Sequence, residues 1–313
     1  MAKLKDLAAQ EEKFVGGHRG CAGCGATIVA RQVLLAAEQP VVVGAATGCL
    51  EVISTIFPYS AWNVPYIHNA FENVAATMSG VEAAYKALKK KGKITKDLRF
   101  IAFGGDGGTY DIGLQALSGM IERRHRVLYI CYNNEAYMNT GIQRSSATPR
   151  GAHTTTSPAG KVIPGKLQLR KNLTEIVIAH EPAYAAQATI GYWNDLVTKV
   201  RKALDADGPS FINVYSPCRL GWAYAPEKTI KVSKLAVETC VWPLYEYQDG
   251  TYHITVKPKE KKPITEFLNV QGRFGHLFQW KDDIPIKEYQ AEVDFIWNRL
   301  LKRSEVQKSK EPG

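Results

Sequence analysis

Through residue 224, short apolar runs alternate with segments whose apolar residues recur every three or four positions. The runs are typical of strands buried on both faces, and the intervening periodicity is typical of helices that cover a parallel sheet. This alternation predicts an α/β fold with a parallel sheet and helices on both of its faces. The expected strands are 41–44, 100–103, 127–130, 185–190 and 211–215, and the expected helices are 28–37, 81–88, 111–123 and 193–204.

The regular alternation fades from residue 225 onward. Residues 251–256 still have the pattern of a strand, and the apolar spacing over 295–301 predicts a final amphipathic helix. We therefore expect a main α/β domain at 1–224 and an irregular C-terminal extension at 225–313. The extension is expected to pack on partner subunits.

Two polar loops follow neighbouring expected strands at 104–108 and 133–141. A helix expected from about Asp111 joins them, and in such a crossover both loops emerge at the same edge of the sheet. Asp106 offers a carboxylate oxygen and Asn134 an amide oxygen. Glycines around Asp106 let backbone amides approach an anion, and the positive end of the helix points the same way. These groups suit a Mg²⁺ ion that carries a diphosphate.

A Gly-Asp-Gly turn followed at this interval by an asparagine-containing loop resembles the thiamine diphosphate (ThDP) motif. The resemblance implies that Asp106, the Asn134 side chain and the Ala136 carbonyl hold Mg²⁺ on the diphosphate of ThDP. The residues expected to bind the cofactor are Gly48, Gly105, Asp106, Gly107, Gly108, Asn134, Ala136 and Asn139.

Four of the six cysteines lie in expected loops. Cys21 and Cys24 form a Cys-x-x-Cys pair before a helix, whereas Cys49 and Cys218 each follow a strand. Without a secretory signal, metal ligation is expected of them rather than disulfide bonding. Their loops can converge at one edge of the sheet, where four thiolates bind either a [4Fe–4S] cluster or Zn²⁺. A pair plus two single cysteines suits a cluster, but the spacing leaves zinc open.

The remaining cysteines, Cys131 and Cys240, are expected to be small core residues. Hydrophobic residues make up 45% of the chain and charged residues 22%, as in soluble globular proteins. No apolar run approaches the roughly 20 residues that span a bilayer, and the N-terminal residues lack a signal-peptide core. A cytoplasmic protein is expected. The net charge of +10 is scattered, which fits an acidic partner or phosphorylated ligands better than nucleic acid.

Several motifs, taken in order, resemble the β subunit of multi-subunit 2-oxoacid:ferredoxin oxidoreductases, most closely the members that act on pyruvate. The resemblance covers nearly the whole chain. The segments that carry it are 17–25, 47–51, 68–73, 104–113, 137–141 and 216–218.

The resemblance implies that Cys21, Cys24, Cys49 and Cys218 ligate a [4Fe–4S] cluster near ThDP, and that Asn139 faces the thiazolium ring and the substrate. Thr47 is a further candidate on the substrate side. The implied reaction is oxidative decarboxylation of a 2-oxo acid, with pyruvate as substrate and coenzyme A as acyl acceptor. The electrons would pass to the cluster and on to ferredoxin. Oxalate, which needs no coenzyme A, is the substrate of a related enzyme.

The resemblance also implies that this chain works only in a complex with pyrimidine-binding α, γ and ferredoxin-like δ subunits. ThDP needs a carboxylate at N1′ of its aminopyrimidine ring, and the family places that group on another subunit, although Glu51 and Glu72 are present here. Two other readings of the residues are a non-redox ThDP enzyme with structural zinc and a metal-stabilised interaction subunit. The long segment 139–166 is expected either to cover the cofactor or to form a disordered insert.

Overall fold

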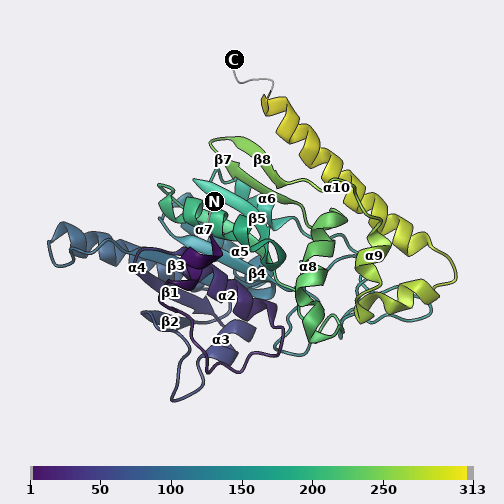
Figure 1. Ribbon diagram of the computed structural model, residues 1–313, viewed down its shortest axis with the longest axis horizontal. Coiled ribbons are helices and arrows are strands. Elements are labelled where there is room, and N and C mark those ends of the chain that lie inside the picture. Colours follow the sequence, from purple (N-terminus) through teal and green to yellow (C-terminus); the bar gives the residue numbers. More distant parts are fainter. Residues whose placement is uncertain (1–2, 309–313) are drawn as a thin grey trace.

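One sheet organises the computed structural model, which describes residues 3–308 (Figure 1). In this range eight strands lie in the order β2-β1-β3-β4-β6-β5-β7-β8; the first six are parallel, and β7 and β8 run antiparallel. The expected α/β fold with a parallel sheet is confirmed. The strands are β1 Val41–Ala46, β2 Tyr66–Asn69, β3 Arg99–Gly105, β4 Leu128–Asn133, β5 Tyr184–Thr189, β6 Ser210–Tyr215, β7 Leu244–Gln248 and β8 Thr251–Val256.

Helices cover both faces of the sheet. On one face α2 and α7 pack together, and on the other α4 and α6 contact the strands while α5 packs beside α4. The α-helices are α1 Leu4–Ala8, α2 Gly25–Ala36, α3 Cys49–Ser54, α4 Val74–Lys90, α5 Leu114–Glu122, α6 Leu173–Ile178, α7 Trp193–Asp205, α8 Thr229–Glu238, α9 Ile264–Leu268 and α10 Ile284–Lys308. The shorter helical turns are η1 Gly107–Ile112, η2 Ile190–Tyr192, η3 Pro226–Lys228 and η4 Gly272–Gln279.

The central strands are buried on both faces because successive side chains enter opposite core layers. In β3, Ile101 and Phe103 pack into the layer under α2 and α7, whereas Phe100 and Ala102 pack into the layer under α4 and α5. This explains why the strands appear in the sequence as continuous apolar runs. Because these strands are parallel, their carboxyl ends, and the polar loops that follow them, lie at the same edge of the sheet.

The loops that carry the candidate chemistry leave the carboxyl edge of the sheet. From β1 the chain continues to β2 on one side, whereas β3 lies on the other side of β1. Such a reversal opens a crevice between the ends of two adjacent strands, where α/β proteins bind ligands. Gly48 follows β1 at this crevice, and Gly105 ends β3 opposite it.

In two places the chain becomes helical earlier than the sequence pattern indicates, although the α-helix α5 itself begins later than expected. After Asp106 the chain enters η1, a π-helical turn over Gly107–Ile112, and α5 follows from Leu114 rather than from Asp111. Glycines at the start of η1 carry no apolar side chain, so the apolar period could not reveal this turn. Similarly, α2 begins at Gly25, directly after Cys24. Both helical starts therefore lie closer to the candidate ligands than expected.

The C-terminal part is more regular than the irregular extension that the pattern predicts. The hairpin of β7 and β8 joins the same sheet through β5, and α10 packs along β8. An ion pair between Arg303 and Glu175 ties α10 to α6. The expected strand 251–256 and the final helix are both present. The division at 224/225, and packing of this part on other subunits, stay predictions.

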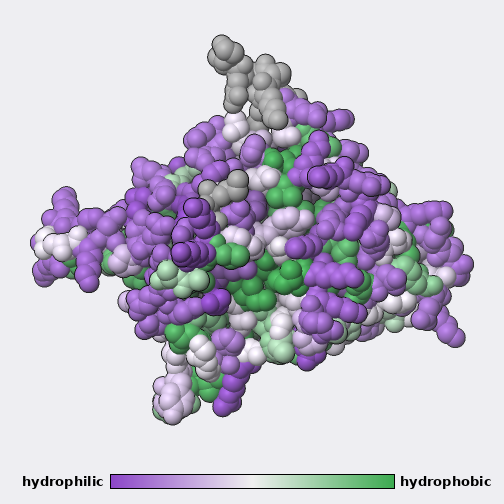
Figure 2. Space-filling view, viewed as in Figure 1, coloured by the Kyte–Doolittle hydropathy of each residue, from purple (hydrophilic) through white to green (hydrophobic). Residues whose placement is uncertain are grey.

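The long segment 139–166 packs against the body of the protein, with Ser145 and Thr148 buried. The Lys166 ammonium, also buried, donates to backbone carbonyls of this segment, including that of Thr148. On the outside, polar side chains cover most of the face shown in Figure 2, and apolar ones gather near its centre. Among residues 3–308 no helix is long and apolar enough to cross a membrane.

Candidate cofactor and cluster site

Three oxygen-bearing groups converge where β3 and β4 end. The Asn134 amide N–H donates to Oδ1 of Asp106 at 3.1 Å. In one of its two orientations, the Asn134 carboxamide points its nitrogen at the other two groups, donating to the Ala136 carbonyl at 2.8 Å and to Oδ1 of Asp106 at 2.9 Å. In the other orientation, rotated by half a turn, the Asn134 carboxamide oxygen lies beside the Ala136 carbonyl oxygen and Oδ1 of Asp106. A carboxylate, an amide oxygen and a carbonyl at one point form a donor set that fits Mg²⁺.

Asp106 is 1% exposed, and burial raises the pKa of its carboxyl to about 7. Hydrogen bonds from the Ser145 hydroxyl (2.5 Å) and from the backbone N–H of Asn134 oppose this shift. A carboxylate buried in this way is stabilised by a bound cation, because an opposite charge favours the ionised form. The electrostatics of the site therefore agree with its geometry.

Glycines form a cradle beside this clamp. A methyl group on Gly107 would lie 2.5 Å from the Tyr137 ring, and one on Gly48 would lie 2.7 Å from the Tyr132 hydroxyl. Tyr132, which is 1% exposed, lines the pocket between Gly48 and Gly105. The Leu50 N–H lies near its oxygen, and the hydroxyl has no hydrogen-bond acceptor among the described residues. A buried, unpaired hydroxyl that lines a pocket fits a site built for a polar ligand.

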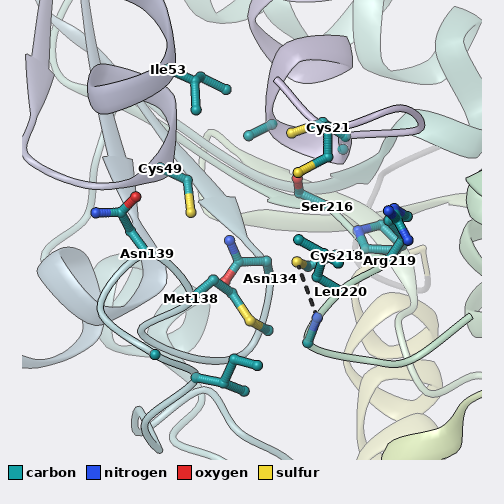
Figure 3. Close-up of a pocket in the computed structure, with 17 residues that line it drawn as sticks. Cys21, Cys49, Ile53, Asn134, Met138, Asn139, Ser216, Cys218, Arg219 and Leu220 are labelled. Carbon is teal, nitrogen blue, oxygen red and sulfur yellow. Dashed lines mark hydrogen bonds between the residues drawn. The ribbon is translucent and has the colours of Figure 1, made fainter. Parts of the chain in front are cut away.

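The thiols of Cys21, Cys24, Cys49 and Cys218 line one cavity of about 350 Å³ (Figure 3). They come from the loop before α2, the start of α3 and the loop after β6. The Gly221 N–H donates to Cys218 Sγ at 3.5 Å.

Burial and the neighbouring thiols raise the pKa of three of these cysteines. Burial, together with the nearby thiols of Cys218 and Cys24, raises the pKa of Cys49 to about 12. Burial likewise raises the pKa of Cys24 and Cys218. Thiolates crowded in this way need positive charge among them, which a metal centre supplies. In the described range no group of three or more His, Cys, Asp or Glu side chains is already arranged around a single metal-ion position.

The cavity and the Asp106 pocket adjoin each other. Both are lined by Cys49, Asn134, Met138 and Asn139. In Figure 3 Asn139 and Asn134 stand on the side of the cavity near Cys49, across from Cys21. Two groups bound in these spaces would therefore lie against each other.

Two of the expected site residues lie outside both spaces. The Thr47 hydroxyl donates to the Asn69 carbonyl at 3.0 Å and lies 3.0 Å from Nε2 of His68. Gly108 lies in η1, where a methyl group would meet the Phe71 carbonyl at 2.7 Å. The expected core cysteines, Cys131 and Cys240, are both buried.

Neither Glu51 nor Glu72 lines the Asp106 pocket. The Glu51 carboxylate accepts a hydrogen bond from the Thr55 hydroxyl at 2.9 Å, and Glu72 is exposed just before α4.

Sequence reasoning missed the groups that support the clamp. Glu135, between the two candidate Mg²⁺ ligands of the second loop, is 0% exposed and has a φ of 65°. Its carboxylate pairs with Arg170 and Arg273, each at 2.6 Å. A charged residue next to Asn134 indicates a role at the clamp, but the sequence could not identify the partners of Glu135, because Arg170 and Arg273 lie far away along the chain. Ser145 was missed for the same reason, and Tyr132 was missed because Gly48, which it faces across the pocket, is also distant in the sequence.

The fold and the site together define a ThDP-binding domain. The family profile described as "Thiamine pyrophosphate enzyme, C-terminal TPP binding domain" matches residues 46–214, more than half of the chain. The match runs from the end of β1 to β6 and so contains Asp106, Asn134 and Cys49. The expected class of cofactor is confirmed.

Relatives of similar length identify the family more narrowly. The chain is 58% identical to the pyruvate synthase subunit PorB of Thermotoga maritima, over 98% of both chains. It is 55% identical to PorB of Methanocaldococcus jannaschii, over 91% of this chain and 95% of the relative. The chain therefore belongs to the PorB family of 2-oxoacid:ferredoxin oxidoreductase subunits, as the motifs indicated. It is also 47% identical to the ketoisovalerate oxidoreductase subunit VorB of Pyrococcus abyssi, over 95% of this chain and 94% of that one.

A solved structure supports the fold. A 2-oxoglutarate:ferredoxin oxidoreductase from Magnetococcus marinus superposes with a TM-score of 0.56 at 19% identity, over 66% of each chain.

Proposed function

We propose that this chain is the subunit of a pyruvate:ferredoxin oxidoreductase that carries ThDP, Mg²⁺ and one [4Fe–4S] cluster. The observation that carries the proposal is the shared wall between the cysteine cavity and the Asp106 pocket. Because Cys49, Asn134, Met138 and Asn139 line both spaces, an electron that leaves one bound group has a short path to the other.

The cysteine cavity supports a cluster better than a zinc ion. Its four thiols come from three separate segments of the chain: the loop before α2, the start of α3 and the loop after β6. A [4Fe–4S] cluster takes four thiolates at the corners of a larger body. We assign Cys21, Cys24, Cys49 and Cys218 as its ligands.

In the Asp106 pocket, Asp106, the Asn134 side chain and the Ala136 carbonyl would hold Mg²⁺ on the diphosphate. Bound ThDP supplies an electron sink for decarboxylation of a 2-oxo acid. Asn139, exposed at the junction of the two spaces, would orient the substrate by hydrogen bonding. Burial of the clamp excludes water from the charged groups. Thr47 stays a candidate on the substrate side through its contact with the exposed His68.

The site of this chain is half of an active site. Since Glu51 and Glu72 lie outside the Asp106 pocket, the carboxylate for N1′ of the cofactor would come from a pyrimidine-binding subunit. PorB is by name one subunit of pyruvate synthase, so we place this chain in a complex with subunits of the α, γ and ferredoxin-like δ types. The net charge of +10 suits ferredoxin, an acidic protein, as electron acceptor.

The first experiment concerns the cluster. The complex, purified without oxygen, is assayed for iron and sulfide and by electron paramagnetic resonance (EPR). Cys49→Ala should lose the signal and the iron of one cluster, whereas Cys240→Ala, a change at a buried core cysteine, should keep both. A colourless complex with zinc in this subunit would contradict the redox assignment and support a structural zinc site.

The second experiment concerns the cofactor and the substrate. Asp106→Ala should abolish Mg²⁺–ThDP binding and leave the iron content unchanged; retention of ThDP would remove the assignment of the clamp. Ferredoxin reduction is then measured with pyruvate, 2-oxoisovalerate and oxalate, each with and without coenzyme A. We expect pyruvate with coenzyme A to be the fastest. Turnover of oxalate without coenzyme A would instead identify an oxalate oxidoreductase.

A further inference from the structure

A buried ion-pair triad lies directly behind the Mg²⁺ clamp. Glu135 accepts from Nη1 of Arg170 and from Nη2 of Arg273, both at 2.6 Å. The Glu135 side chain is completely buried, and the two arginine side chains are 9% and 3% exposed. Ion pairs so thoroughly removed from water are held firmly only when the geometry and the remaining hydrogen bonds are good. Here both conditions are met.

The triad fixes an unfavourable backbone conformation. Glu135 has a φ of 65°, in the left-handed region that side chains other than glycine rarely adopt. Its N–H donates to Oδ1 of Asn133 at 3.0 Å, and its carbonyl accepts from the Thr148 hydroxyl at 2.6 Å. Residues in such conformations persist when their surroundings over-determine them. This backbone turn is what brings the Asn134 side chain and the Ala136 carbonyl to the same point.

Arg273 makes a second connection to the clamp. Its guanidinium stacks 3.8 Å from the centre of the Trp222 ring, and Nε donates to Oε1 of Gln271 at 2.9 Å. Trp222 in turn donates from Nε1 to the Asn134 carbonyl at 2.8 Å. One arginine from η4 therefore supports the clamp both through Glu135 and through Trp222.

We propose that Arg273, with Arg170, is a positioning residue for Mg²⁺–ThDP, so that the C-terminal part of the chain sets the affinity of the cofactor site. This inference rests on the proposed assignment of Asp106, Asn134 and Ala136 to Mg²⁺. Groups that orient the ligands of a metal typically change its affinity 10- to 100-fold when they are removed. The effect should appear in cofactor binding and leave the cysteine cavity intact.

The test is made on the assembled complex. Arg273→Met should raise the concentration of Mg²⁺–ThDP needed for half-saturation by roughly 10- to 100-fold, measured by quenching of tryptophan fluorescence. Iron content should be unchanged, and excess Mg²⁺–ThDP should restore occupancy. Arg273→Lys, which keeps the charge but loses the planar stacking, should give an intermediate loss.

The matched control is Arg303→Met. Arg303 also belongs to the C-terminal part and stacks on an aromatic ring, that of Tyr252, while pairing with Glu175 on α6. The Arg303→Met variant should have a lower melting temperature and an unchanged affinity for Mg²⁺–ThDP. If Arg273→Met behaves like Arg303→Met, with lower stability and unchanged half-saturation, the positioning role is refuted.

Two further results keep the outcomes separate. If Arg273→Met fails to assemble, Glu135→Gln tests the same link from the other end, and unchanged cofactor affinity in that variant would refute the inference. If Asp106→Ala loses ThDP while Arg273→Met and Glu135→Gln bind it normally, this inference fails and the proposed function stands. If Asp106→Ala retains ThDP, the proposed function itself fails.

Discussion

Ser145 Oγ donates a 2.5 Å hydrogen bond to Oδ2 of Asp106, and so ties the long segment after β4 to the turn after β3. The same hydroxyl oxygen accepts the Ala147 N–H at 3.1 Å. The other carboxylate oxygen of Asp106 accepts the Asn134 N–H. Both oxygens of the buried carboxylate are therefore oriented by the protein before any cation arrives.

Ser145→Ala should weaken Mg²⁺–ThDP binding. The hydrogen bond from Ser145 opposes the effect of burial on the pKa of Asp106, so its loss favours the protonated carboxyl. A hydrogen bond to a charged group contributes about 1.5–3 kcal/mol, which corresponds to roughly 10- to 100-fold in affinity. The measurement is a titration of the cofactor-free complex with Mg²⁺–ThDP at neutral pH.

The neighbouring serine provides the control for this prediction. Ser146 contacts Oδ2 of Asp111 through its backbone N–H at 3.1 Å, and alanine keeps that N–H. Ser146→Ala should therefore bind Mg²⁺–ThDP like the wild type. Equal affinities in the two variants would show that the hydroxyl of Ser145 does not orient Asp106 for the cation.

The sequence could place Asp106 and Asn134 together because each follows a buried strand, and adjacent parallel strands end at one edge. The same reasoning brought Cys49 and Cys218 to that edge. It could not reach Ser145, which lies in a segment without periodicity. Nor could it reach Arg273, whose contact with Glu135 spans 138 positions. Such contacts depend on tertiary packing rather than on local pattern.

Gly107→Ala should damage the cofactor pocket. The added methyl group would lie 2.5 Å from the Tyr137 ring, and that ring cannot move freely because its hydroxyl donates to the Gly107 carbonyl at 3.0 Å and to Asp111 at 3.2 Å. Overpacking of this kind costs about 1–3 kcal/mol. We expect a lower melting temperature together with loss of bound ThDP.

Gly80 is the control for Gly107, since it lies inside α4 and an added methyl group would meet nothing within 4 Å. Gly80→Ala should be neutral or stabilise the protein by up to about 1 kcal/mol, because alanine is the better helix former. A Gly107→Ala variant that binds ThDP normally and melts like Gly80→Ala would contradict the cradle.

Lys166 should give the stability a measurable pH dependence. Burial lowers its pKa from 10.5 to about 8. Between pH 8 and 10.5 the unfolded chain holds a proton at this lysine that the folded chain has lost, so this group makes stability rise with pH across that window. The difference of 2.5 units (10.5 minus 8) corresponds to at most about 3 kcal/mol.

Lys166→Met removes this dependence. The variant should gain stability relative to the wild type below pH 8, where the wild type holds a buried charge, and the gain should shrink as the pH approaches 10.5. Thermal unfolding of both complexes at the two ends of the window measures it. Lys161→Met, at an exposed position of the same segment, should show a constant difference from the wild type. A constant difference for Lys166→Met as well would show that Lys166 does not titrate in this window.

Tyr132→Phe should change stability and cofactor binding in opposite directions. In the cofactor-free complex the buried Tyr132 hydroxyl has no acceptor among the described residues of this chain, so its removal should stabilise the fold by about 1 kcal/mol. If that hydroxyl donates to a ligand in the pocket, its removal should weaken Mg²⁺–ThDP binding roughly tenfold. Tyr129, on the same strand, is the control because its hydroxyl lies 3.0 Å from that of Thr109. Tyr129→Phe breaks a satisfied pair and should lower stability, with no specific effect on the cofactor. A Tyr132→Phe variant that is destabilised to the same degree, with normal cofactor affinity, would show that the Tyr132 hydroxyl is a structural group rather than a ligand-binding one.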